Sequence, residues 1–455
     1  MTRQTMAIRP TGWRRTGWLV AAGLGFAALA AAALVTGCGS VRGGAPGGAA
    51  SVGGRTQTGT ATPVKVTATA SGSATAQATQ GSSGFWPLSL DMTSAAAGWA
   101  LYDSQSPLNV SSPLALLATT VDGGRSWTDV TPAAARAMLA TTFATEALDP
   151  VDSEHAYLAV SGATQDSETA ANPAAVFTTA DGGRTWTESA PFTVDGPVIQ
   201  VTFADARHGW LLVGTGNSAN GTPLPWLYRT TDGGLHWTPA PAAPPPGEGG
   251  SNNMCTLFGV TFPTASTGWV HVTCRSGDYL AESRDGGSTW AVQMLPATRT
   301  CSNLGTQCGL FGPQMSDGTA YVTIAPVTGV TAPALFASAN FGQSWRQLPL
   351  PAGSEQYPQI TFFGPADGML VTKASQEALG AVFYTTSDGG QTWTAVPQGT
   401  HFTQLGAAVD FASPQDGFSW TQAGYATEST PPPLYATTNS GRTWTSFTPE
   451  VGAEA

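Results

Sequence analysis

Short apolar runs separated by turn residues recur along most of the chain. Runs such as "IQVTF" at 199–203, "FGVTF" at 258–262 and "PQITF" at 358–362 are rich in β-branched and aromatic residues. Runs of this length and composition are typical of β-strands. The 55 Gly and 33 Pro residues also favour many turns and short strands over long helices. The pattern therefore predicts an all-β chain of short antiparallel strands.

One phrase, close to "TTADGGRTW" at 178–186, occurs seven times and ends each time in Trp. The seven residues that end it are Trp127, Trp186, Trp237, Trp290, Trp345, Trp393 and Trp444. They are 59, 51, 53, 55, 48 and 51 residues apart, a period in the range of propeller blades and other repeat arrays.

A second landmark precedes each of these Trp residues by 21 to 29 positions. It lies at Trp99, Tyr157, Trp210, Trp269, Tyr321, Met369 and Phe418. With the run of the "IQVTF" type before it, each unit consists of four short strands. One four-stranded meander leaves its faces open, whereas seven in a closed ring cover one another. The sequence thus predicts a seven-bladed β-propeller of four-stranded antiparallel blades over residues 85–449. An open β-solenoid, the alternative, normally has shorter repeats.

The repeated phrase, written T-x-D-G-G-x-x-W, resembles the Asp-box or BNR repeat of sialidases, sortilin-type receptors and some endoglucanases. Its pairing with an upstream D-x-x-x-G-W strand is closer to propellers of the photosystem II stability and assembly factor type. The resemblance covers residues 85–449 and implies the propeller fold. It does not decide function, because this repeat serves enzymes and binding proteins alike.

The box itself is expected to be structural. An Asp or Asn side chain accepts hydrogen bonds from backbone N–H groups two residues on, Gly permits positive φ, and the Trp packs over the turn. A catalytic carboxylate would not occur at five equivalent positions. The predicted turn formers are Asp122, Asp181, Asp232, Asp285 and Asp388, with Asn340 and Asn439 in the fifth and seventh units.

The N-terminus is predicted to lie outside the fold. Several Arg residues precede an apolar run from Trp18 to Val35, which is the layout of an export signal over residues 1–37. The run ends in "LVTGC", which resembles a lipobox and implies that Cys38 is acylated. An uncleaved membrane helix is the alternative. Residues 38–84 are rich in Gly, Ala, Ser and Thr and predict a disordered linker, while 450–455 form a short tail.

Ligand binding is expected on the face opposite the boxes, called here the loop face. In a four-stranded meander the boxes and the D-x-x-x-G turns share one face, the box face, and the variable loops fall on the other. Binding residues often lie on variable loops of a rigid scaffold. The candidates for this face are Trp226, Arg275, Arg299 and Trp420. Core packing for the Trp residues and plain solvation for the Arg residues are the alternatives.

Four cysteines follow Cys38, at Cys255, Cys274, Cys301 and Cys308. Cys255 begins one predicted strand and Cys274 ends the next, so a cross-strand disulfide is natural, and Cys301 and Cys308 then close one loop. Four cysteines permit three connectivities, and a zinc site is the rival interpretation. No His stands at ligand spacing, so no metal is expected. No Gly-rich phosphate loop follows a strand and opens a helix, so no cofactor is expected either.

Charge excludes one class of partner. Charged residues make up 10% of the chain, the net charge is −11, and Lys65 and Lys373 are the only lysines. The basic footprint that nucleic acids require is missing.

An enzyme of the sialidase type would need three Arg residues, a Tyr–Glu pair and an acid around the central channel, and the chain offers no obvious set. The hypothesis is therefore a monomeric lipoprotein on the extracytoplasmic face of the cell membrane that binds an envelope protein as a non-catalytic scaffold or assembly factor. The alternative is a carbohydrate-binding module or a sialidase-like glycoside hydrolase.

Overall fold

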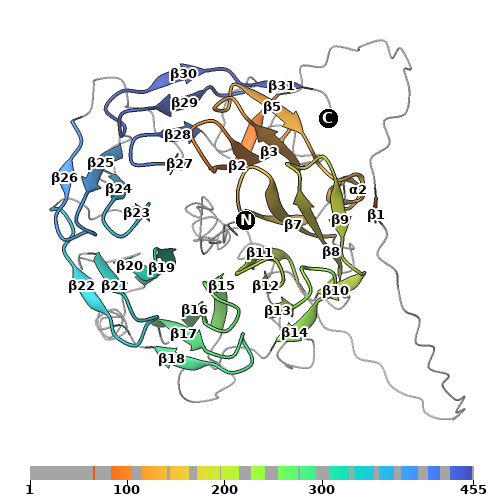
Figure 1. The fold of residues 1–455 in the computed structure, drawn as a ribbon, viewed down its shortest axis with the longest axis horizontal. Helices are drawn as coiled ribbons and strands as arrows, with labels where there is room; N and C mark the ends of the chain where they lie inside the picture. The colour runs from red at the N-terminus through yellow and green to blue at the C-terminus, as the bar shows by residue number, and fades with distance from the viewer. Residues whose placement is uncertain are drawn as a thin grey trace, which may run out of the picture. The chain divides into compact units, whose positions relative to one another are not determined.

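Seven small sheets follow one another around a central axis in the computed structural model (Figure 1). The structure describes residues 65–66, 84–104, 115–140, 144–162, 172–194, 196–214, 227–240, 255–274, 277–293, 295, 308–326, 333–352, 358–373, 381–397, 408–420 and 431–452. The predicted seven-bladed propeller of four-stranded antiparallel blades is confirmed.

Each blade is built from consecutive strands, innermost first. Blades 1 and 2 comprise β2 (Trp86–Met92), β3 (Gly98–Asp103), β4 (Ala115–Thr120) and β5 (Ser126–Asp129), and β6 (Thr145–Pro150), β7 (His155–Ser161), β8 (Asn172–Ala180) and β9 (Trp186–Glu188). Blade 2 carries in addition β10 (Phe192–Val194), which pairs with β8. Blade 3 comprises β11 (Val198–Phe203), β12 (Gly209–Val213), β13 (Leu227–Thr230) and β14 (Thr238–Ala240).

The remaining blades repeat this order. Blade 4 comprises β15 (Cys255–Thr261), β16 (Gly268–Cys274), β17 (Gly277–Ser283) and β18 (Ala291–Gln293), and blade 5 comprises β19 (Cys308–Ser316), β20 (Thr319–Pro326), β21 (Ala334–Ser338) and β22 (Arg346–Leu348). Blades 6 and 7 comprise β23 (Gln359–Phe362), β24 (Gly368–Lys373), β25 (Ala381–Thr386) and β26 (Thr394–Ala395), and β27 (Ala408–Phe411), β28 (Gly417–Trp420), β29 (Leu434–Thr437) and β30 (Thr445–Phe447). The two-residue strand β1 (Lys65–Val66) falls within the predicted linker.

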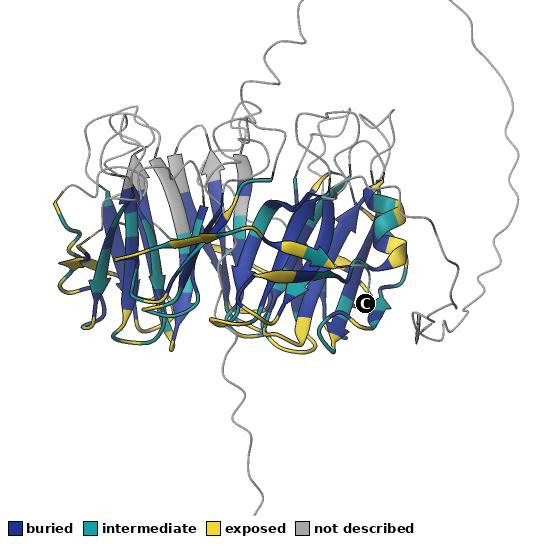
Figure 2. Ribbon diagram, turned by 90° about the horizontal axis from the view of Figure 1, so that it is seen from above, coloured by how far each residue is buried: buried dark blue, intermediate teal, exposed yellow. Residues whose placement is uncertain are grey.

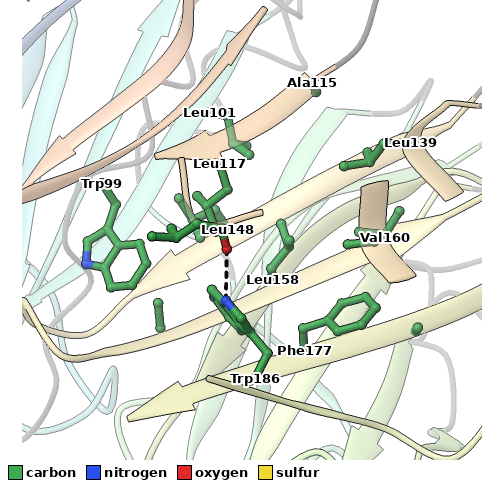
Figure 3. Close-up of a cluster of buried hydrophobic side chains, with 14 residues drawn as sticks. Trp99, Leu101, Ala115, Leu117, Leu139, Leu148, Leu158, Val160, Phe177 and Trp186 are labelled. Carbon is green, nitrogen blue, oxygen red and sulfur yellow. Dashed lines mark hydrogen bonds between the residues drawn. The ribbon is translucent and has the colours of Figure 1, made fainter. Parts of the chain in front are cut away.

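The hydrophobic core lies between blades. The cluster between blades 1 and 2 joins Trp99, Leu117, Leu158 and Phe177, and the indole N–H of Trp186 donates to the Val130 carbonyl across the gap at 2.9 Å (Figure 3). Burial is concentrated in the inner strands, and exposed residues lie in turns at one edge of the ring and on the outermost strands (Figure 2).

The second landmark of each repeat is the residue that spans neighbouring blades. Tyr157 stacks on Phe203 with ring centroids 3.5 Å apart, and Trp210 stacks on Phe262 at 3.6 Å. Aromatic pairs of this kind add to the free energy gained from area burial alone. The landmark therefore holds adjacent blades together.

The box turn is held by a denser set of bonds than the sequence predicted. The N–H of Ser126, four residues after Asp122 rather than two, donates to its Oδ1 at 2.9 Å, and the Ser126 hydroxyl donates to Oδ2 at 2.6 Å. The Thr120 hydroxyl donates to Asp122 Oδ1 at 3.0 Å and accepts from the Gly124 N–H at 3.0 Å. Gly124 has φ of 82°, so only Gly adopts this turn without strain.

The ring closes between blades 7 and 1 on three levels. Near the axis the Met92 N–H donates to Asp410 Oδ2 at 3.1 Å, and farther out Phe418 and Trp420 share a core with Leu90. At the outer rim β31 (Glu450–Gly452) pairs in parallel with β5. Each repeat is one whole blade, as expected. Residues 450–455 were expected to form a tail, but residues 450–452 form β31, which adds a fifth strand to blade 1.

Among the described residues, one helix interrupts the all-β pattern. α2 (Ala133–Leu139) lies in the link between blades 1 and 2 and buries Ala135 and Leu139 in their shared core. Arg136 binds Asp129 at 3.0 Å, which holds the helix against blade 1. In the described part of the chain no helix is both long and apolar enough to cross a membrane.

Candidate functional site

Seven polar or charged residues occupy the same place on the innermost strands. Strand register sets each of them opposite the second landmark of its blade, so they are equivalent around the ring. They are Asp91, Asp149, Thr202, Thr261, Gln314, Thr361 and Asp410.

Three of these residues bind the backbone of the next blade in the same manner. Asp149 Oδ2 accepts from the Phe203 N–H at 2.9 Å, and Gln314 Oε1 accepts from the Phe362 N–H at 3.2 Å. Asp410 makes the corresponding bond across the ring closure. Burial raises the pKa of Asp149 to about 7, although the Phe203 N–H opposes that rise. These side chains are best understood as joints between blades.

Glu146 differs from this set. It lies one residue after the start of β6, the innermost strand of blade 2, at the end farther from the boxes. Register pairs it with Val160, and alternation places it on the same side of β6 as Leu148. Both Val160 and Leu148 belong to the apolar core shared with blade 1. Burial among such groups raises the pKa of Glu146 to about 7.

The neighbouring side chains tie this end of blade 2 to blade 3. The hydroxyls of Thr145 and Ser161 lie 2.7 Å apart, and the Val198 N–H donates to them at 2.8 and 3.2 Å. The strand that carries Glu146, β6, is therefore fixed to blade 3 on the side away from the core shared with blade 1. We call Glu146 with Leu148 and Val160 the Glu146 site.

A carboxyl with a pKa near 7 exists in both protonation states at neutral pH, so it is able to give or take a proton. Glycoside hydrolysis usually needs a second carboxyl about 5 to 9.5 Å away on the far side of the sugar bond. Asp149, three residues along the same strand, points to the opposite face of β6 and is bonded to Phe203. Asp149 is therefore unsuited to be that partner.

The structure describes one of the four candidates for the loop face. Trp226, Arg275 and Arg299 lie outside the described residues. Trp420 is 1% exposed and contributes to the core between blades 7 and 1, so it offers no open surface to a ligand. Its burial corresponds to the core-packing alternative.

The structure places three of the four cysteines by their backbone alone. Cys255 and Cys274 are register partners on β15 and β16, which is the placement that a cross-strand disulfide requires. Cys308 begins β19 opposite Pro326, and Cys301 lies outside the described residues. The disulfides stay a prediction. Within the described ranges, no three His, Cys, Asp or Glu side chains gather as a metal site would need.

The box carboxylates are engaged in their own turns. Hydrogen bonds from the hydroxyl and N–H of Thr289 hold the pKa of Asp285 at about 2, and Thr392 does the same for Asp388. Asn439 replaces the carboxylate by accepting the Thr443 N–H through Oδ1 and donating from Nδ2 to the Thr443 hydroxyl. An amide performs the same task, so the position needs no charge.

Sequence reasoning missed Glu146 because the sequence does not show which face of its strand packs on another blade. The local signal is weak: a charged residue in a strand, "EALDP" at 146–150, that also contains apolar residues. Glu at a position that faces an apolar core is uncommon and indicates a perturbed carboxyl.

Part of the chain matches a known family. The sequence model described as "Photosynthesis system II assembly factor YCF48" matches residues 251–448. A xyloglucanase from Paenibacillus sp is 26% identical over 281 residues, which cover 55% of this chain and 26% of the xyloglucanase. The match thus spans about a quarter of that relative's length.

Several solved structures are similar over most of the chain. YCF48 bound to D1 peptide has a TM-score of 0.45 and 14% identity, and the match covers 75% of this chain and 92% of that one. The GH74 xyloglucanase from Xanthomonas campestris has a TM-score of 0.48 and 18% identity, covering 82% and 55%. YCF48 from Cyanidioschyzon merolae has a TM-score of 0.42 and 17% identity, covering 67% and 85%.

The seven four-stranded blades and their repeated boxes define the class of protein, an Asp-box or BNR-type β-propeller. Over residues 251–448 its sequence matches the YCF48 family model.

Proposed function

We propose that this chain is a non-catalytic binding propeller of the cell envelope, a scaffold or assembly factor for a membrane protein complex. The observation that carries the proposal is the match of residues 251–448 to the assembly-factor family. This region contains blades 4 to 7 and all four cysteines that follow Cys38.

The use of the described carboxylates supports a binding role. The box Asp residues are bonded within their turns, and Asp149 and Asp410 join blades. These carboxylates therefore stabilise the propeller itself, and a rigid framework is what a scaffold with adaptable loops requires.

Localisation belongs to the same proposal. Acylation of Cys38 would hold the propeller at the extracytoplasmic face of the membrane, with residues 39–84 as the spacer. Growth of the host with an alkyne-tagged fatty acid should label the wild-type chain and leave Cys38→Ala unlabelled. A wild-type chain that takes up no label would exclude a lipid anchor at Cys38.

Capture from membranes tests the binding role. The full chain, tagged beyond Ala455 through a flexible spacer so that β31 stays free to pair, is isolated from detergent-solubilised membranes of its host. A stoichiometric membrane protein should accompany it, and should be lost when residues 301–308 are replaced by a Gly/Ser segment of equal length. Recovery of glycan without protein would overturn the scaffold.

A carbohydrate-directed role is the second candidate, and the 26% identity to a xyloglucanase favours it. Here Glu146, which is partly exposed near the start of β6 and has a raised pKa, would be the proton donor. Incubation with xyloglucan and assay of new reducing ends tests this role, with Glu146→Gln as the matched variant. Release of sugar by the wild type that falls at least 100-fold in the variant would establish hydrolysis.

A further inference from the structure

The outer edge of blade 1 is covered by the chain's own end. β31 runs parallel to β5 with Val451 opposite Trp127, and the Glu450 N–H donates to the Arg125 carbonyl at 2.8 Å. An open strand edge presents unpaired N–H and C=O groups, which pair readily with another extended segment. In the described part of the chain, the outer strands of blades 3 to 7 carry no such added strand.

The attachment of β31 is small. Only three residues pair, and of these Glu450 and Gly452 are exposed. Val451 alone is half-buried, where it packs against the core that contains Trp127 and Phe85. Short segments with few buried contacts open at low free-energy cost. β31 is therefore able to leave β5 while the blade remains.

The seated segment shows what the edge accepts. Backbone pairing along β5 is independent of side-chain identity, so specificity falls on the anchor opposite Trp127, where the chain places a β-branched Val. Exposed Arg125 lies beside the edge, with its guanidinium 5.7 Å from the Phe447 ring centre. This guanidinium also donates to the Asp122 carbonyl, and Glu450, just before the anchor, pairs with Ser126, the residue that follows Arg125.

We propose that the β5 edge is a strand-docking site and that an extended segment of the protein partner replaces β31 there. The segment carries a β-branched anchor with an acidic residue before it. This inference rests on the proposed scaffold function and adds a contact at the outer rim of blade 1 to the contact proposed on the loop face. The pairing mode is strand addition to an exposed sheet edge.

The probe is a fluorescein-labelled peptide with the sequence of residues 448–455, "TPEVGAEA". Fluorescence anisotropy measures its affinity for the full wild-type chain, for the chain that lacks residues 450–455, and for full-length Val451→Asp. Both variants uncover the edge, so each should bind at least 10-fold more tightly than wild type. A peptide with Asp in place of Val should not bind any of the three.

The proposal is overturned if the variants keep the wild-type circular dichroism spectrum yet gain no affinity, or if wild type binds the peptide equally well. It is also overturned if neither variant folds, because a strand that the ring cannot lose is not replaceable. Membrane capture reports separately on the scaffold. If membrane capture succeeds but the peptide does not bind, only this docking mode is excluded.

Discussion

At the scale of single residues, two boxes depart from the Gly-Gly rule. Phe341 and Ser440 replace the first Gly of the fifth and seventh boxes and have φ of 52° and 62°. Side chains with a Cβ clash in this region, at a cost of about 1–2 kcal/mol. Asn340 and Asn439 precede them, so both boxes that lost the carboxylate also lost the favourable backbone.

Phe341→Gly should therefore stabilise the fold by about 0.5–1 kcal/mol, because relief of the left-handed strain exceeds the entropy that Gly adds to the unfolded chain. Urea unfolding measures the difference. Gly342→Ala, at φ of 79° in the same turn, is the matched control and should destabilise. A Phe341→Gly chain that is less stable than wild type would show that the exposed ring contributes more than its backbone costs.

Glu146 gives a pH dependence with a definite sign. Its pKa rises from 4.5 unfolded to about 7 folded, so the stability present below pH 4.5 is lost as the pH climbs to 7. Glu146→Gln should remove this loss, and at pH 8 should add up to about 3 kcal/mol, reduced by the water that still reaches the side chain.

Unfolding by urea at pH 4 and pH 8 checks the expectation for Glu146. The variant should match wild type at pH 4 and exceed it at pH 8. Glu154→Gln, in an exposed turn of the same blade, serves as control and should behave alike at both values. An equal shift for Glu146→Gln at both pH values would contradict a raised pKa.

At the scale of elements, the nine-residue box joins the third strand of a blade to the fourth. Its carboxylate gathers two donors from one later residue and one from an earlier Thr, and the carbonyl of its second Gly often accepts the indole N–H, as Gly124 does from Trp127 at 2.9 Å. The turn and the returning strand are thereby fixed together.

Asp181→Ala should cost about 1–3 kcal/mol, because three donors lose their acceptor. These donors are the N–H and hydroxyl of Thr185 and the hydroxyl of Thr179. Asp181→Asn should stay close to wild type, since Asn439 makes the equivalent bonds. Thermal unfolding of the two variants decides, and an Asn variant as weak as the Ala variant would show that the box requires charge.

Blade number, blade boundaries and box positions were predictable from the sequence because the period and the Gly-Gly turns leave few solutions. β31 was not, because it is a strand of three residues that follows the last repeat and carries no repeat signal. α2 was hidden for a similar reason, as "AAARAML" is too short to show a helical period. Glu146 was missed because its pKa depends on blade 1, which the local sequence does not reveal.

At the scale of the whole molecule, closure of the ring makes every blade a neighbour of two others. The seam between blades 7 and 1 is sealed near the axis by Asp410, farther out by the shared core, and at the rim by β31. A defect at the seam therefore affects the stability of the entire propeller rather than of one blade.

Asp410→Ala should lower the free energy of unfolding by about 1–3 kcal/mol, because the Met92 N–H is left buried without its acceptor. Asp410→Asn keeps a carbonyl oxygen and should lose less. Trp fluorescence and circular dichroism should report one coincident transition in both variants. Two separated transitions would mean that the blades unfold independently of closure.

The central claim is that the propeller holds a protein partner on its loop face and performs no hydrolysis. The most direct measurement is membrane capture with three full chains: wild type, the 301–308 replacement, and a box-face control with Arg207→Glu and Glu154→Arg. Wild type and the box-face control are predicted to retain the same membrane protein, and the 301–308 replacement to lose it. Loss in the box-face control alone, or capture of glycan instead of protein, would contradict the account.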